Sequence, residues 1–135
     1  MIKISVIVTT YNRPKLLKET LDSILNQTYV DFELIVVDNN SNYDFFKLIE
    51  SFNDNRIIAY QNENDGIIAV NRNFGIKKSK GQYIAFCDDD DIWVKSKLEI
   101  QLRQIEISHA DIISSNISIF KDNIKDILIE TKAKK

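Results

Sequence analysis

Four consecutive aspartates, at positions 88–91, are the residues of this sequence best suited to chemistry. They follow an apolar segment, residues 84–87, that we expect to be buried. Desolvating a carboxylate without a partner is costly, so a bound cation would balance the charge. In extended backbone Asp88 and Asp90 lie on one side, about 7 Å apart, and Asp89 points the other way. Oxygen ligands without His or Cys favour Mg²⁺ or Mn²⁺ over zinc.

The aspartate run also suits a solvated acidic turn that caps the next helix, and the sequence leaves this alternative open. A calcium-binding EF-hand loop does not fit, because Trp93 stands where that loop needs glycine. The single histidine, His109, is expected at the surface. The single cysteine, Cys87, has no evident base beside it and is expected to be a buried apolar residue.

A second polar group follows the apolar residues 4–8 and consists of Thr9, Thr10, Tyr11 and Asn12. An exposed Tyr11 ring could stack on a nucleobase. The helix that Asn12 is expected to cap would offer backbone N–H groups to an anion. Taken alone, Tyr11 fits a half-buried loop aromatic better.

Asp38 and Arg72 are two further candidate ligands. Asp38 follows the apolar residues 32–37 within the sequence DNNS, where it could accept hydrogen bonds from a base or ribose, or form a turn. Arg72 lies in the sequence NDGIIAVNRNFG, and its planar guanidinium could bind a phosphate or a rim carboxylate. A surface position explains Arg72 equally well.

Short β-branched segments alternate with segments of helical periodicity along the chain. Strictly alternating strands and helices predict an α/β fold with a mainly parallel sheet. Ligands of such sheets bind beyond the carboxyl ends of the strands, so the polar groups that follow three predicted strands should meet at one rim. The expected strands are residues 4–8, 32–37, 56–60, 82–87 and 111–120, and the expected helices are residues 14–25, 45–52, 64–78 and 94–105.

The composition excludes several classes of protein. The chain has 135 residues, enough for one compact domain, with 44% hydrophobic and 28% charged residues and a formal net charge of -2. The near-neutral charge gives no support for nonspecific nucleic-acid binding, and a single cysteine excludes an intramolecular disulfide. Without a membrane-length apolar run or a signal-peptide pattern, a soluble intracellular domain is expected.

Four sequence blocks in order, SVIVTTYNRPKLLKETLDSILNQTY, ELIVVDNNS, NDGIIAVNRNFG and GQYIAFCDDDDIW, resemble the family 2 nucleotide-sugar glycosyltransferases of GT-A fold. The resemblance implies a Rossmann-like three-layer sandwich and a nucleotide-sugar-binding domain over residues 1–135. It also implies metal-assisted transfer of a sugar, with inversion, from a nucleoside-diphosphate sugar, often UDP-linked. The acceptor would be a carbohydrate or a lipid-linked hydroxyl, and the location cytoplasmic or peripheral at the inner face of the membrane.

The same resemblance implies roles for the polar residues outside the aspartate run. Thr9, Tyr11 and Asn12 would frame the base. Asp38 would bind the base or the ribose, and Arg72 would lie near the base and the diphosphate.

The aspartate run matches the family's Asp-x-Asp element. Asp88 would approach the ribose and the metal, Asp89 would belong to the nucleotide-sugar site, and Asp90 would coordinate Mn²⁺ or Mg²⁺. A divalent cation suits the reaction, because the leaving diphosphate gains negative charge that the cation stabilises. The cation would also keep an acidic rim from repelling an acidic ligand.

In this family the acceptor site and the general base lie in a second half, and nothing in residues 92–135 resembles it. We therefore expect a sheet that is incomplete at its C-terminal side, and no catalytic base can be named. Apolar residues near the end of the chain are expected on an uncovered face or at a sheet edge, favouring self-association or docking of a C-terminal half. They are Ile112, Ile113, Ile117, Ile119 and Phe120.

Two other functions compete with the transferase interpretation. A noncatalytic nucleotide-binding or interaction module of the same fold is the nearest, and donor-transfer assays would separate the two. A phosphoryl-transfer receiver or phosphatase fits less well, because the first strand ends in TTYN rather than in carboxylates. The chain also lacks a P-loop sequence.

Overall fold

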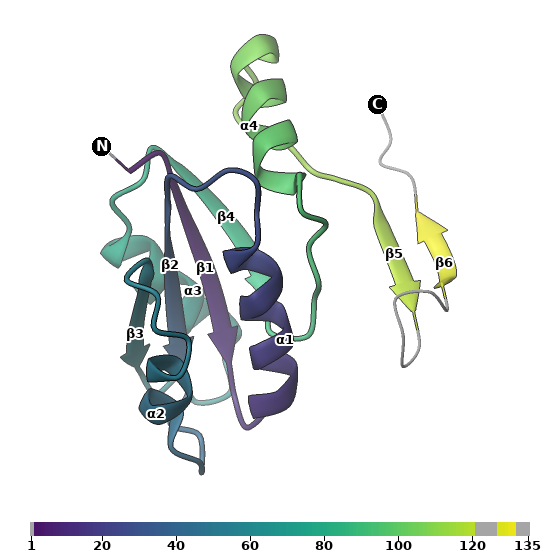
Figure 1. Ribbon diagram of the computed structural model, residues 1–135. Coiled ribbons are helices and arrows are strands. Elements are labelled where there is room, and N and C mark those ends of the chain that lie inside the picture. Colours follow the sequence, from purple (N-terminus) through teal and green to yellow (C-terminus); the bar gives the residue numbers. More distant parts are fainter. Residues whose placement is uncertain (1, 121–126, 132–135) are drawn as a thin grey trace. The chain divides into compact units, whose positions relative to one another are not determined.

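The structure is a computed structural model that describes residues 2–120 and 127–131 (Figure 1). It divides into two compact units, residues 1–95 and 96–135. The first unit holds a parallel sheet with helices, and the second holds one helix and a strand pair. Among the described residues, no helix is both long enough and apolar enough to cross a membrane.

The sheet of the first unit has the strand order β3-β2-β1-β4, and every neighbouring pair is parallel. The predicted parallel α/β fold is therefore confirmed, and each predicted strand of this unit forms within one or two residues of its expected bounds. The strands are β1 (Ile4–Thr10), β2 (Phe32–Asp38), β3 (Ile57–Gln61) and β4 (Tyr83–Asp88), and the helices are α1 (Pro14–Leu25), α2 (Phe45–Glu50) and α3 (Ile68–Lys78).

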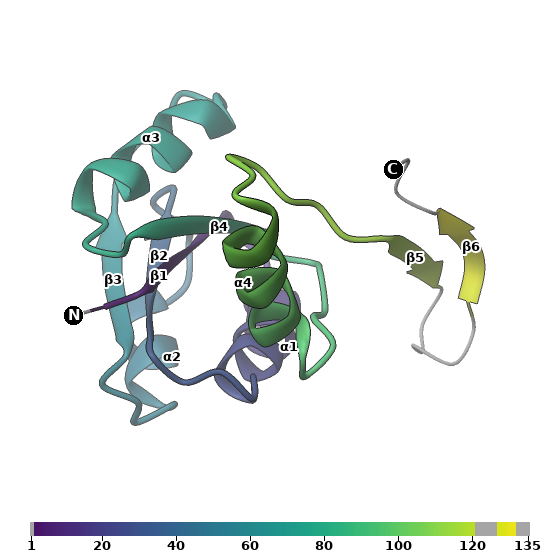
Figure 2. The same cartoon turned by 90° about the horizontal axis from the view of Figure 1, so that it is seen from above.

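Helices cover both faces of the two central strands. Figure 2 shows α3 on one side of the sheet and α1 with α2 on the other. On the α3 side, Ile7, Ile35 and Val37 form a buried cluster against Phe74 and Tyr60. Because side chains alternate along a strand, the intervening residues of β1 and β2 face the opposite side, and they too are buried. This explains why both strands read as almost uninterrupted apolar segments.

Strand β4 corrects one expectation. Residues 84–87 were expected to be buried, but Ile84 and Phe86 are 41% and 48% exposed, whereas Cys87 is 4% exposed. In the described sheet β4 pairs only with β1, and α3 packs on β1 and β2. The α3 side of β4 is therefore open, which an apolar sequence pattern alone does not reveal.

A buried polar network fastens the start of the sheet. Ser5 Oγ donates to Glu33 Oε1 at 2.6 Å, and the Lys80 N–H donates to the same oxygen at 2.6 Å. The Gly81 N–H donates to Ser5 Oγ at 2.8 Å. Together these bonds hold the α3–β4 connection against the first residues of β1 and β2, and so fix where β4 enters the sheet.

Gly81→Ala tests that close approach. A Cβ at position 81 would lie 2.5 Å from the backbone nitrogen of Ser5 and 2.7 Å from the carbonyl carbon of Ile4. Neither backbone atom can move without disturbing β1, so we expect a loss of about 1–3 kcal/mol in the free energy of unfolding. Urea unfolding measures it, with Lys80→Ala as the control because that exposed side chain can be removed while its N–H stays. Equal stability of the two variants would contradict the packing described here.

Arg56 joins the turn before β3 to the end of α1. Its Nη2 donates to the Leu25 carbonyl at 3.1 Å, and Nε and Nη2 donate to the two carboxylate oxygens of Asp54 at 3.0 and 2.7 Å. The guanidinium also lies over the Phe32 ring, 4.7 Å from its centroid. Hydrogen bonding from Arg56 is the main reason that the pKa of Asp54 is below its ordinary value.

Asp54→Asn should therefore lower stability near neutral pH, by about 1 kcal/mol because the pair is partly exposed. Since Arg56 favours the ionised carboxyl, its contribution is full above the ordinary pKa of about 4 and is lost as the pH falls through the lower folded-state pKa. The difference from the parent chain should shrink over that acidic range in urea unfolding. Asp31→Asn, at an exposed position, is the control. A difference that stays constant down to pH values well below 4 would count against the ion pair.

The end of the first unit explains an error in the fourth predicted helix. That helix was expected from residue 94, yet α4 begins three residues later, as Lys97–Ser108. The Trp93 N–H donates to Ser23 Oγ, and the Val94 carbonyl accepts from Gln27 Nε2. These bonds tie residues 93 and 94 to α1 and to the residues just after it, and Val94 is 65% exposed.

The second unit departs further from expectation. A strand was expected over residues 111–120, but only β5 (Ile117–Phe120) forms. It pairs antiparallel with β6 (Ile127–Thr131), which was not predicted. The apolar residues expected on an uncovered face are exposed at Ile112, Ile117 and Ile119 and partly exposed at the other two positions. Self-association through this segment stays a prediction.

Candidate functional site

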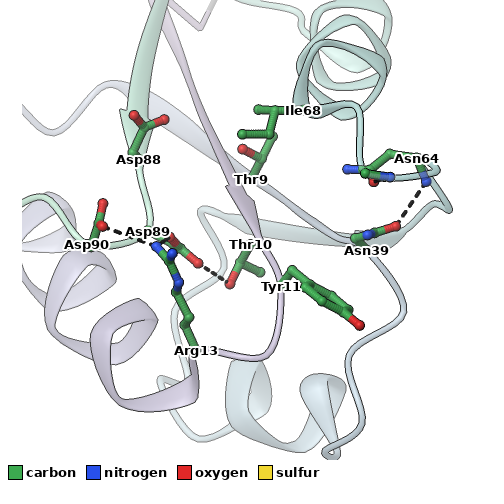
Figure 3. Close-up of a pocket in the computed structure, with 11 residues that line it drawn as sticks. Thr9, Thr10, Tyr11, Arg13, Asn39, Asn64, Ile68, Asp88, Asp89 and Asp90 are labelled. Carbon is green, nitrogen blue, oxygen red and sulfur yellow. Dashed lines mark hydrogen bonds and ion pairs between the residues drawn. The ribbon is translucent and has the colours of Figure 1, made fainter.

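A pocket of about 350 Å³ opens at the carboxyl ends of the parallel strands (Figure 3). Its walls come from the ends of β1 and β4, from the loop after β2, and from the loop that leads into α3. The register explains the meeting of these ends, because Thr9 pairs with Asp88 and Thr10 pairs with Asp38. The lining residues are Thr9, Thr10, Tyr11, Arg13, Asn39, Asn64, Gly66, Ile68, Asp88, Asp89 and Asp90.

One wall of the pocket is acidic, and the chain turns there at residues 89–90 instead of continuing extended as expected. Asp88 and Asp90 are exposed, whereas Asp89 is only 6% exposed. The buried carboxylate accepts from Thr10 Oγ1 at 2.8 Å and from Arg13 Nη1 at 3.2 Å. The same Arg13 nitrogen lies 3.1 Å from Asp90 Oδ2. The burial of Asp89 is therefore matched by two donors, one of them charged.

Arg72 reaches the other exposed carboxylate of this wall. It extends from α3, and its Nη2 donates to Asp88 Oδ1 at 2.5 Å. Of the two partners predicted for Arg72, a phosphate and a rim carboxylate, the structure contains the carboxylate. Arg72 does not itself line the pocket.

The acidic wall keeps uncompensated negative charge. Burial raises the pKa of Asp91, and the negative charges of Asp88 and Asp90 raise it further. Two arginines therefore do not fully neutralise four adjacent carboxylates. A cation added at the rim would meet an attractive field.

The donor set fits a hard divalent cation. Asp88 and Asp90 present carboxylate oxygens at the pocket rim, and the described residues contain no group of three or more His, Cys, Asp or Glu arranged around a common point. Mg²⁺ is commonly bound by one or two carboxylates, with water and substrate phosphates completing its shell. Asp88 and Asp90 could form such a site only together with a phosphate ligand that also binds the ion.

The opposite wall carries amides and an aromatic ring. Asn39 Oδ1 accepts the Asn64 N–H at 2.9 Å, and Asn64 Oδ1 accepts the Gly66 N–H at 2.9 Å. Gly66 has a φ of 78°, which suits a residue without a Cβ. The Tyr11 ring is 54% exposed and lies on the same side of the pocket as Asn39 (Figure 3). This wall offers a planar ring beside fixed hydrogen-bonding groups.

Asp38 and Asn12 lie behind the pocket and do not line it. Asp38 is fully buried and accepts from the Ser41 N–H at 2.9 Å, from Ser41 Oγ and from Gln61 Nε2 at 3.0 Å. Asn12 has a φ of 53°, donates its N–H to Ser41 Oγ at 2.8 Å and accepts the Asn42 N–H at 2.7 Å. Both residues therefore hold the loop after β2 in place.

The structure corrects the expected cap of the first helix. Arg13, not Asn12, is the N-cap residue of α1, and no side-chain capping hydrogen bond forms there. Pro14 occupies the first turn as predicted. The Asn12 side chain is not available for capping because it binds the Asn42 N–H.

Tyr43 was not singled out from the sequence. Its buried hydroxyl has no hydrogen-bond partner among the described residues. Burial raises the pKa of Tyr43, and the nearby negative charges of Asp38 and Asp89 raise it further. The phenol therefore stays protonated between the two carboxylates.

The pocket brings together most but not all of the candidates from the sequence. The candidates that line it are Thr9, Thr10, Tyr11, Asp88, Asp89 and Asp90. The residues that sequence reasoning did not select are Arg13, Asn39, Asn64, Gly66 and Ile68. Arg13 directly follows the polar group at the end of the first strand, and Asn64 opens an Asn-Asp-Gly turn, so both carried a weak local signal.

Fold and pocket define a class: a parallel α/β domain whose ligand site lies at the carboxyl ends of its strands, with carboxylates facing an aromatic and amide wall. The sequence profile described as Glycosyl transferase family 2 matches residues 5–131. The Escherichia coli UDP-Glc:alpha-D-GlcNAc-diphosphoundecaprenol beta-1,3-glucosyltransferase WfaP is 37% identical over 119 residues, 88% of this chain and 47% of that protein. An uncharacterized glycosyltransferase of Rickettsia bellii is 44% identical over 105 residues, 77% of this chain and 15% of that one.

Solved structures agree. The crystal structure of residues 1–349 of S. aureus TarS in complex with UDP-GlcNAc matches with a TM-score of 0.74 and 29% identity, over 89% of this chain and 38% of that chain. The chain belongs to glycosyl transferase family 2, and the predicted family and fold are confirmed. It spans less than half the length of these relatives.

Proposed function

We propose that the chain binds a nucleoside-diphosphate sugar in this pocket, as the donor-binding part of an inverting, metal-assisted glycosyltransferase. The observation that carries the proposal is the pairing of two exposed carboxylates, Asp88 and Asp90, with an exposed ring, Tyr11, across one pocket. A nucleotide diphosphate has a base to stack and an anionic end that needs a cation. The E. coli relative is named for a UDP-Glc donor and TarS was crystallised with UDP-GlcNAc, which supports a UDP-linked donor.

The walls of the pocket divide the donor between them. Tyr11 would stack on the base, and Asn39 and Asn64 would border it with fixed amides. Asp88 would face the ribose, and Asp88 with Asp90 would hold Mn²⁺ or Mg²⁺. When bound, that ion would supply Lewis-acid stabilisation of the charge that develops on the leaving diphosphate.

The acceptor belongs to the proposal as well. The E. coli relative is named for a diphosphoundecaprenol-linked sugar, which supports a lipid-linked acceptor. Peripheral work at the inner face of the membrane is part of the same proposal. An inverting transfer needs a base within hydrogen-bond reach of the acceptor hydroxyl. No residue of the described pocket is assigned that role.

Calorimetric titration of UDP, with and without Mn²⁺, tests the donor site directly. We expect binding that Mn²⁺ strengthens, and weaker binding of inorganic diphosphate because it lacks a base for Tyr11. Absence of UDP binding under both conditions would overturn the proposal. Incubation with a UDP-sugar then distinguishes a transferase from a noncatalytic module, through hydrolysis or transfer of the sugar.

Asp90→Asn should remove most of the Mn²⁺-dependent gain in UDP affinity, because one of the two rim carboxylates is lost. The free energy of unfolding should change by less than about 0.5 kcal/mol, since the lost ion pair with Arg13 is half-exposed and repulsion in the quartet is relieved. Asp91→Asn removes the same charge one residue along, from outside the pocket lining, and serves as the control. An Asp90 variant as responsive to Mn²⁺ as this control would refute the metal role.

Tyr11→Ala should weaken UDP binding by about 1–3 kcal/mol if the ring stacks on the base. Tyr11→Phe keeps the ring and should bind UDP nearly as well as the parent chain. The calorimetric affinities of both variants decide the matter. Similar affinities for the two variants would return Tyr11 to the role of an ordinary loop aromatic.

A further inference from the structure

Arg13 makes two contacts of unequal strength with the acidic wall. Its Nη1 bonds Asp89 at 3.2 Å and Asp90 at 3.1 Å. The Asp89 side chain is 9% exposed and is also held by Thr10, whereas the Asp90 side chain is 49% exposed. Exposed ion pairs contribute little, so the contact with Asp90 is easily given up and the contact with Asp89 is not.

Arg13 also has hydrogen-bond donors without partners among the described residues. A guanidinium carries five N–H groups, and only those of Nη1 have partners among the described residues. Arg13 lines the pocket, with its guanidinium toward Asp89 and Asp90 (Figure 3). Nε and Nη2 are thus available for a further acceptor, and a diphosphate is the acceptor that a planar guanidinium fork binds best.

We propose that Arg13 is an exchangeable counter-ion: anchored on Asp89, it neutralises Asp90 in the ligand-free chain and turns to the donor's diphosphate when Asp90 takes a divalent cation. This inference rests on the proposed nucleotide-sugar site. It makes Arg13 a donor-binding residue and explains how an acidic wall avoids binding stray cations before the donor arrives. Arg13 and the divalent cation are both positively charged, so they compete for the Asp90 carboxylate. The anionic diphosphate can bind both of them at once.

Opposite effects on the two ligands are the signature of this exchange. In Arg13→Gln, Mn²⁺ alone should bind about three- to tenfold more tightly, because its competitor for Asp90 is gone. UDP in the presence of saturating Mn²⁺ should bind about tenfold more weakly, because charged donors to the diphosphate are lost. A merely structural brace would instead weaken both, by disordering the wall.

Electron paramagnetic resonance of free Mn²⁺ and UDP calorimetry at saturating Mn²⁺ measure the two affinities. Lys15→Gln is the matched control, since it removes the same charge from an exposed side chain two residues along. Its effects should be less than about twofold, because exposed charges are screened. Arg13→Lys keeps the charge and should restore the parent's weak Mn²⁺ binding.

The outcomes separate this inference from the proposed function. If the parent chain binds no UDP with or without Mn²⁺, the nucleotide-sugar site is wrong. If the parent binds UDP with Mn²⁺ while Arg13→Gln matches Lys15→Gln, or loses affinity for both ligands, only the exchange is wrong. Arg13→Met, which keeps the apolar stem, replaces the Gln variant if that one unfolds by circular dichroism. Unfolding of both would make Arg13 a structural brace and overturn the exchange.

Discussion

Negative charge at the carboxyl end of β4 is the constraint around which the rest of the pocket is arranged. Asp89 turns inward and is stabilised by the Thr10 hydroxyl and the Arg13 guanidinium. Asp88 remains at the rim, where Arg72 reaches it from α3. Each arginine comes from a different element, so the charge of one turn links the β1–α1 loop and α3 to the end of β4. Electrostatics here organises the tertiary structure as well as the site.

The register of the parallel strands fixes the positions of the residues at the strand ends. Thr9 is paired with Asp88, and Thr10 with Asp38, through the buried register of the central strands. Because both faces of the central strands are buried, a shift of one residue would force every core side chain to repack on the other face. The strand ends can therefore carry reactive groups in fixed positions, while the loops that follow them supply the variable wall.

Local patterns predicted much of this, and contacts between distant residues account for the errors. Asp89 is buried and its neighbours are exposed, but residues 89–90 form a turn, so alternation in extended backbone is not the cause. Continuous apolar segments correctly located the central strands. The same reasoning was wrong for Ile84 and Phe86, because edge position in a sheet is a property of the whole topology. Helix α4 starts later than its periodicity suggests because residues 93–95 are hydrogen-bonded to the end of α1 and to the residues that follow it.

The candidate site shows the same limit. Arg13 carried only a weak local signal in the sequence, because its partners lie 76 and 77 residues away. The sequence identified Asp38 as a candidate but did not predict the direction of its side chain. Its carboxylate accepts a hydrogen bond from Gln61, which lies 23 residues further on. The residue types at strand ends thus predicted where a ligand would bind. They did not predict which side chains form the wall and which support it.

Asp38 illustrates why that distinction matters for mechanism. A fully buried carboxylate whose oxygens both accept hydrogen bonds can reach a ligand only by giving up a protein donor. Its influence on a bound nucleotide would then pass through Ser41, which binds both Asp38 and Asn12. The loop so fixed carries Asn39 into the pocket. A family position associated with ligand binding can therefore act here by shaping the wall, and its substitution would alter the pocket before it removed any direct contact.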